Sequence, residues 1–313
     1  MTRDHTLSNT FLHSHALEQC GTEDTDDQQY YYDDDDVRKR EYSRFLVATK
    51  GNEEEAQQRL EERVAFRHRQ GNLLGGMPHP HFFMLKNVYH HGILGKTSDG
   101  SYVMVDQMGR FNQSMKVWRS RGVTEHDILN HSMLIMEWFC NHVDTRPYPG
   151  GRFVRVYDFE GFRVQHVRNL GAIRLGMKII GMIEQYYPER LERCIVINAP
   201  PLLRHLWNSI VKNMLDSRTA EKFVLHKKED TLQVMKDLLS PESLPPDYGG
   251  IGQWYDSAEE RALFSFVKKV NESFGVINSC FHILYMSVFN TCHNSSRCLC
   301  CGGAPSLDSV ANV

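Results

Sequence analysis

The sequence predicts an α/β fold built around a mainly parallel β-sheet. Four apolar stretches have strand character, at 102–105, 153–157, 194–197 and 223–225. Segments with helical periodicity separate them, at 124–142, 167–183 and 201–216. Because neighbouring parallel strands need long crossover connections, this alternation indicates parallel strands joined by helices.

Local signals support each of these elements. Thr124 can cap a helix with an acidic first turn. The segment 167–183 carries its apolar residues on one helical face, at Val167, Leu170, Ile173, Met177, Ile180 and Ile183. Pro188 lies just past the end of that helix. The stretch 194–197 is apolar on both faces, which is typical of a central strand.

The chain is expected to divide into four parts. Residues 1–36 end in a run of aspartates and predict a disordered acidic tail, because such a run repels itself and buries nothing. Residues 37–75 predict a small helical module, broken into two helices at Gly51 and Asn52. The α/β domain occupies 76–252, and a helical extension with a cysteine cluster occupies 253–313.

Composition limits the class of function. The 313 residues contain 36 Lys and Arg against 39 Asp and Glu, a net charge of −3. This balance argues against a nucleic-acid binder, although a local basic face could still meet anionic lipid. The N-terminus shows no secretory signal, and the first four cysteines are scattered. We therefore expect a cytoplasmic monomer without a bound metal.

The segment 201–215 carries a broad apolar stripe. Its members are Leu202, Leu203, Leu206, Trp207, Ile210, Val211 and Met214, with Leu215 at the end. The pattern alone favours an ordinary core helix packed on the sheet. The other interpretation is a movable helix that covers a cavity when closed and contacts lipid when open.

Several motifs together resemble the CRAL-TRIO lipid-binding domain, in its phosphatidylinositol/phosphatidylcholine transfer branch. They are 186–191 (YYPERL), 197–200 (INAP), 215–216 (LD), 219–222 (TAEK) and 244–250 (LPPDYGG). The resemblance extends from about residue 38 to residue 250. It implies a mostly parallel sheet that floors an apolar pocket, a gate helix at 201–215 and a preceding helical module.

The resemblance also implies the ligand and its site. The expected function is binding of phosphatidylinositol and its transfer between membranes, with transient contact at a membrane surface and no catalysis or cofactor. Matching the family motifs, Lys50, Glu189, Thr219 and Lys222 are candidate head-group ligands. Thr49 stands where the family has a further basic residue, so one expected charge is missing.

Two other classes of function remain open from the residues. An enzyme is suggested by His166, which follows Asp158 and Glu160, but the nucleophile elbow, phosphate loop and zinc-protease motifs are absent from the sequence. A lipid sensor that does not transfer its ligand, or a carrier of a sterol or tocopherol, would need the same pocket and gate.

The C-terminal extension has its own open question. Residues 258–273 predict an amphipathic helix, and 274–289 are too short and polar for a membrane span. Cys298, Cys300 and Cys301 are candidates for palmitoylation, which would favour peripheral association with a Golgi, endosomal or plasma membrane. Zinc binding with Cys292 and His293, or free thiols, are the alternatives.

Phosphatidylcholine is not expected to be a second ligand. Arg163 and Gln165 stand at the family's small hydroxyl positions, and Leu94 and Met104 stand near its choline-binding tyrosines. An arginine opposes a quaternary ammonium, and the aromatic cage is missing. A vesicle assay should therefore show phosphatidylinositol transfer well above phosphatidylcholine transfer; efficient transfer of phosphatidylcholine would contradict this expectation.

Overall fold

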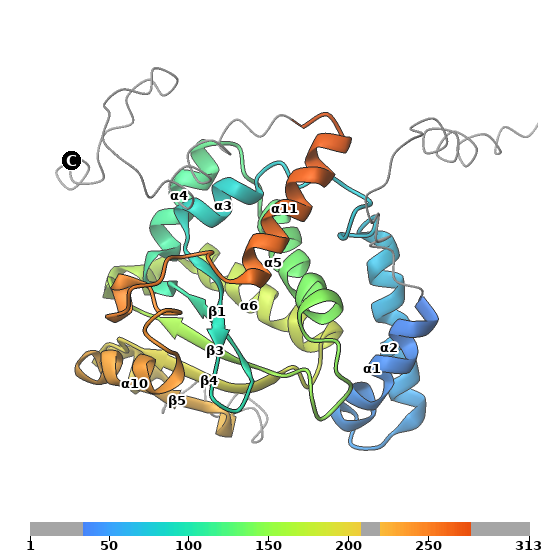
Figure 1. Ribbon diagram of the computed structural model, residues 1–313, viewed down its shortest axis with the longest axis horizontal. Coiled ribbons are helices and arrows are strands. Elements are labelled where there is room, and N and C mark those ends of the chain that lie inside the picture. The colour runs from blue at the N-terminus through green and yellow to red at the C-terminus, as the bar shows by residue number, and fades with distance from the viewer. Residues whose placement is uncertain (1–33, 208–219, 277–313) are drawn as a thin grey trace, which may run out of the picture.

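A five-stranded sheet forms the centre of the computed structural model, which describes residues 34–207 and 220–276 (Figure 1). The strands lie in the order β1-β2-β3-β4-β5. Their bounds are His91–Lys96, Tyr102–Asp106, Phe153–Asp158, Leu191–Ile197 and Phe223–Leu225. β2 to β5 are parallel, whereas β1 is antiparallel to β2. The predicted α/β fold with a mostly parallel sheet is confirmed.

β1 is the strand that the sequence did not reveal. Gly92 and Gly95 lie within it and lower its strand propensity, so the stretch does not stand out as apolar or alternating. Pairing with β2 is irregular between Ile93 and Gly95. Gly92 is needed for close packing, because an added Cβ would lie 2.5 Å from Oε1 of Glu260.

Helices fill both sides of the sheet and its flank (Figure 1). The α-helices are α1 Asp34–Ala48, α2 Glu53–Arg69, α3 Phe82–Val88, α4 Phe111–Ser120, α5 Glu125–Trp138, α6 Leu170–Tyr186, α7 Pro201–Leu206, α10 Thr231–Leu238 and α11 Ala258–Ser273. Shorter turns are η1 Met108–Arg110, η2 Phe139–Val143, η3 Val164–Arg168, η5 Lys228–Asp230 and η6 Pro246–Tyr248. The helices expected from 124, 167 and 258 onward correspond to α5, α6 and α11.

Alternation along the strands assigns a helix layer to each sheet face. Val154 and Val156 of β3 pack in a cluster with Met235 and Leu238 of α10. Phe153, on the opposite face, packs in a larger cluster with residues of α5, α6 and α11. The α6 helix therefore lies over the face that carries Phe153.

The predicted helical module is a pair of helices joined at the expected break. Gly51 adopts a φ of +88° between α1 and α2, and Phe45, Ala56 and Leu60 form their shared core. The predicted tail boundary at residue 36 needs correction, because α1 begins at Asp34. Aspartates in the first turn favour helix formation through the helix dipole. The remainder of the acidic tail lies outside the described residues.

The C-terminal helix α11 is part of the main core. Its Leu263, Phe266 and Val267 are buried in the cluster that includes Phe153. Glu260 accepts hydrogen bonds from Nζ of Lys86 at 2.9 Å and from the backbone N–H of Ile93 at 2.8 Å. Within the described part of the chain, no helix is long and apolar enough to cross a bilayer.

Replacing Glu260 by alanine should destabilise the fold by about 3–5 kcal/mol, because the ammonium of Lys86 would stay buried without its counter-charge. Glu272→Ala, at an exposed position of the same helix, is the control and should cost less than about 0.5 kcal/mol. Denaturant unfolding monitored by circular dichroism measures both. Similar losses for the two variants would show that the Lys86–Glu260 pair does not hold α11.

Candidate functional site

Two of the predicted head-group residues meet at the amino ends of β4 and β5. Glu189 precedes β4, and Lys222 precedes β5. Nζ of Lys222 lies 3.7 Å from Oε2 of Glu189, and both side chains are partly exposed. This distance exceeds a normal hydrogen bond, so the ammonium retains donors for an incoming acceptor.

A network of buried arginines fixes the turn that carries Glu189. Arg44 of α1 donates from Nη1 to the carbonyl of Glu189 at 2.8 Å and from Nη2 to the carbonyl of Gly150. Arg190 donates from Nη1 to the carbonyls of Asp144 and Gly151 at 3.1 and 2.9 Å. Arg44 thus links the helical module to the Glu189 turn, and Arg190 links that turn to the segment that precedes β3.

Glu41 of α1 is the anion at the centre of this network. Its Oε1 accepts from Nη2 of Arg190 at 2.6 Å, and its Oε2 lies 3.0 Å from Nη1 of Arg63. These three side chains are almost completely buried. Burial alone raises the pKa of Glu41, but the charges of Arg63, Arg190 and Arg40 outweigh it and lower that pKa to about 2.

The other two predicted residues of the helical module are placed differently. Thr49 is buried, and its hydroxyl lies within 3.0–3.2 Å of the backbone carbonyls of Phe45 and Leu46 in the last turn of α1 and of Asn52 at the start of α2. Lys50 is exposed and has a left-handed φ of +56°. No contact given by the described residues joins either side chain to Glu189 or Lys222. Thr49 therefore ends a helix in this structure.

The α6 helix presents an apolar stripe to the outside. Leu170, Ile173, Met177 and Ile180 are between 39% and 63% exposed, although they are large hydrophobic residues. The helix is anchored through its other side, where Ala172 and Leu175 are buried against α4 and α5. Exposed apolar stripes of this kind mark binding surfaces more often than folding defects.

A second apolar group lies at the β4 and β5 end of the sheet. Cys194, Val196 and Ala199 are buried there, and Leu203 of α7 and Phe223 pack on them. Of the predicted gate residues, Leu202 and Leu203 belong to α7, and the ring of Trp207 lies 4.6 Å from that of Phe223. Thr219, Ile210, Val211 and Met214, the side chain of Leu206, and Cys298, Cys300 and Cys301 lie outside what the structure describes.

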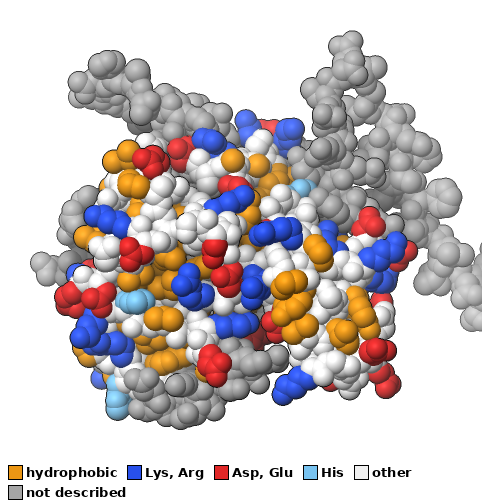
Figure 2. Space-filling view, turned by 60° about the horizontal axis from the view of Figure 1, so that its bottom comes forward, with side chains coloured by type: hydrophobic (Ala, Val, Ile, Leu, Met, Phe, Trp, Pro, Cys, Tyr) orange, Lys and Arg blue, Asp and Glu red, His pale blue; other side chains and the backbone are white. Residues whose placement is uncertain are grey.

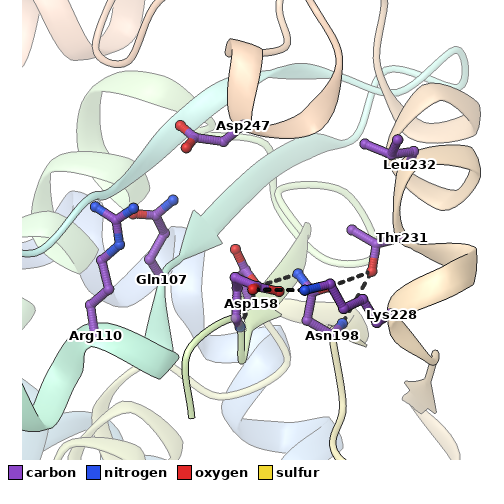
Figure 3. A pocket seen from close by; sticks show the side chains of 9 residues that line it. Gln107, Arg110, Asp158, Asn198, Lys228, Thr231, Leu232 and Asp247 are labelled. Atoms are coloured by element: carbon purple, nitrogen blue, oxygen red, sulfur yellow. Dashed lines mark hydrogen bonds and ion pairs between the residues drawn. The ribbon is translucent and has the colours of Figure 1, made fainter.

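A polar hollow of about 340 Å³ lies at the carboxyl ends of β2, β3 and β4, which is the opposite end of the strands from the Glu189–Lys222 pair (Figure 3). Asp158 organises it by accepting from the amide of Asn198 at 2.7 Å and from the hydroxyl of Tyr248 at 3.0 Å. Its lining consists of Gln107, Arg110, Asp158, Glu160, Asn198, Lys228, Thr231, Leu232 and Asp247. These bonds tie the 244–250 motif to the strand ends, which is a structural role for Asp158.

The hollow does not contain the histidine considered for catalysis. His166 instead accepts a hydrogen bond from the backbone N–H of Arg163 at 3.2 Å and packs on Phe162. Burial lowers the pKa of this imidazole. Among residues 34–207 and 220–276, no group of three or more acidic, His or Cys side chains could hold a metal ion.

The arrangement of a mostly parallel sheet, an outward apolar helix face and a charged pair at its end suits a protein that holds an amphipathic ligand. Lipid-binding domains of the CRAL/TRIO type form such a class. The CRAL/TRIO domain matches residues 86–250, which is more than half of the chain. The chain belongs to this family.

Two known proteins show how far the similarity extends. "Protein real-time" of Aedes aegypti is 24% identical over 216 residues, which cover 66% of this chain. The chain spans 32% of the length of that relative. The crystal structure of Sfh5 superposes with a TM-score of 0.54 at 17% identity, covering 77% of this chain and 84% of Sfh5. That likeness shows a shared fold.

Replacing Glu41 by glutamine should destabilise the protein by about 3–5 kcal/mol at pH 7, because buried Arg190 would lose its paired anion and Arg63 would be left with the more distant Glu137, at 3.8 Å. The stabilisation from Glu41 is fully present above its ordinary pKa of 4.5 and is lost as the pH falls towards about 2. Urea unfolding across this range should therefore show the difference from wild type shrinking as acid is added.

The control for this titration is Glu54→Gln, which alters an exposed carboxylate of α2. It should change stability by less than about 0.5 kcal/mol at every pH. A Glu41→Gln difference that stays constant between pH 4.5 and pH 2 would contradict the assigned pKa.

Proposed function

We propose that this chain binds one phosphatidylinositol molecule and transfers it between membranes. The observation that carries the proposal is the exposed apolar stripe of α6, which leads towards the Glu189–Lys222 pair just past the end of that helix. From Leu170 to Ile180 the stripe is about 15 Å long, at 1.5 Å per residue. An amphipathic ligand matches this order of surfaces.

The acyl tails supply most of the affinity. A diacyl lipid has about 30 methylene groups, each worth roughly 0.8 kcal/mol on burial, so exposing both tails would cost on the order of 25 kcal/mol. A carrier must cover the tails nearly as well as a bilayer does. The α6 stripe and the apolar group around Cys194 and Phe223 offer that kind of surface.

The head group is selected at the charged pair. The ammonium of Lys222 can donate to phosphate oxygens, and the carboxylate of Glu189 can accept from inositol hydroxyls. Their present contact is partly exposed and loose, so exchanging it for a ligand costs little. Thr219, from the same sequence motif as Lys222, is proposed as a further donor to the phosphate.

Membrane contact is proposed on the side where β5 and α10 lie. Figure 2 brings this side forward and shows apolar side chains interspersed with Lys and Arg and with some Asp and Glu side chains. Val224 of β5 and Leu232 of α10 are among the exposed apolar residues. Such a mixture allows shallow insertion together with attraction to anionic lipid. It suits transient contact with a membrane surface.

Native mass spectrometry with lipid identification tests the proposal. Wild type purified from cells should carry phosphatidylinositol, and Lys222→Ala should bind it at least about tenfold more weakly, because a charge-assisted hydrogen bond contributes roughly 1.5–3 kcal/mol. Competition with labelled phosphatidylinositol in vesicles gives the affinity ratio.

Lys228→Ala is the matched control, since Lys228 is an exposed lysine paired with Glu160 at the opposite end of the strands. It should retain the wild-type lipid. A sterol or another neutral lipid in both wild type and Lys222→Ala would contradict the head-group assignment. Wild type that neither carries nor extracts lipid would contradict lipid binding.

A further inference from the structure

Arg155 places a charge in the sheet face that α6 covers. It lies in β3 two residues after Phe153, so both side chains belong to the same face. Phe153 packs in the cluster that includes Met182 and Ile183 of α6. The Arg155 side chain is 16% exposed, so a part of it remains accessible.

The guanidinium of Arg155 is paired with a carboxylate on the neighbouring strand. Its Nε lies 2.5 Å from Oδ2 of Asp106 in β2, so the two side chains form an ion pair. Nη1 donates to the sulfur of Met104 at 3.3 Å, which is a weak acceptor. The ring of Tyr157 lies 5.7 Å from the guanidinium carbon. An arginine has five N–H donors, so these contacts leave capacity for another acceptor.

A row of paired residues leads across the sheet from Arg155 to Phe223, the residue after Lys222. Arg155 pairs with Cys194 of β4, and Cys194 pairs with Phe223 of β5, the residue that follows Lys222. Three residues in one row across a parallel sheet share a face, and two strand spacings amount to about 10 Å. Arg155 thus lies at the inner end of a row whose outer residue, Phe223, directly follows Lys222.

We propose that Arg155 is a second polar anchor, which donates to an ester carbonyl of a glycerolipid whose phosphate is held near Lys222. This inference rests on the proposed function and specifies its ligand further. The residue determines specificity for ester-linked over ether-linked tails. If this sheet face contacted only hydrocarbon, the Arg155–Asp106 ion pair would bring no advantage there, because desolvating a buried ion pair is costly.

The charge balance selects a neutral acceptor over an anion. Asp106 already neutralises Arg155, so a second carboxylate at this place would be repelled by the first. An ester carbonyl adds a dipole without a net charge and can accept from the remaining N–H groups. The ligand group expected at Arg155 is therefore a carbonyl of an intact glycerolipid rather than the carboxylate of a free fatty acid.

A pair of lipids tests the inference on wild-type protein. One is phosphatidylinositol with two ester-linked chains, and the other has two ether-linked chains of equal length and lacks both carbonyl oxygens. Competition binding should favour the ester form by about tenfold, equivalent to 1.4 kcal/mol. Equal affinities would overturn the anchor while leaving lipid binding intact. Wild type that binds neither lipid would overturn the proposed function, and this inference with it.

Two variants separate the anchor from the head-group site. Arg155→Met combined with Asp106→Asn removes both charges together and should bind the two lipids within about twofold of each other. Lys222→Ala should weaken both lipids while keeping the ester preference. A retained preference in the double variant, with a folded circular dichroism spectrum, would overturn the proposal. So would a free fatty acid that binds more tightly than its methyl ester.

Discussion

The buried carboxylate of Glu41 is the constraint on which the placement of the site depends. It lies among guanidinium groups from α1, α2 and the residue before β4, which are buried charges that it helps to neutralise. Arg190 also donates hydrogen bonds to the backbone before β3. The carboxylate of Glu41 therefore aligns the helical module, the segment before β3 and the Glu189 turn. The geometry of the Glu189–Lys222 pair is therefore set by buried residues outside that pair.

Much of the fold could be predicted from local patterns, but this network could not. Helices, parallel strands and the break at Gly51 follow from periodicity and turn residues. Glu41 and Arg63, by contrast, stand in Glu- and Arg-rich helices where such residues are normally solvated. Glu41 is buried because it contacts Arg190, which lies about 150 positions away in the sequence. β1 was missed because its glycines serve close packing rather than strand propensity.

The candidate site shows the same division. Glu189 and Lys222 could be predicted because a recognisable motif surrounds each of them, and the structure brings them together. Arg155 could not, because a charged residue alternating with Val154 and Val156 is typical of a solvent-facing position in a strand. Its partner Asp106 comes from the neighbouring strand. A pair formed across strands leaves no signal in either segment alone.

The exposed stripe of α6 connects stability with ligand binding. Ala172 and Leu175 hold the helix from one side, and the Arg190 network holds the turn beyond its carboxyl end, so α6 can leave its other side uncovered. A ligand that covers this side binds the folded chain and has no comparable surface in the unfolded chain. By mass action it then stabilises the fold in proportion to the logarithm of its concentration over its dissociation constant. Under the proposed function, the lipid would complete a core that the polypeptide leaves open, and its release would expose the α6 stripe again.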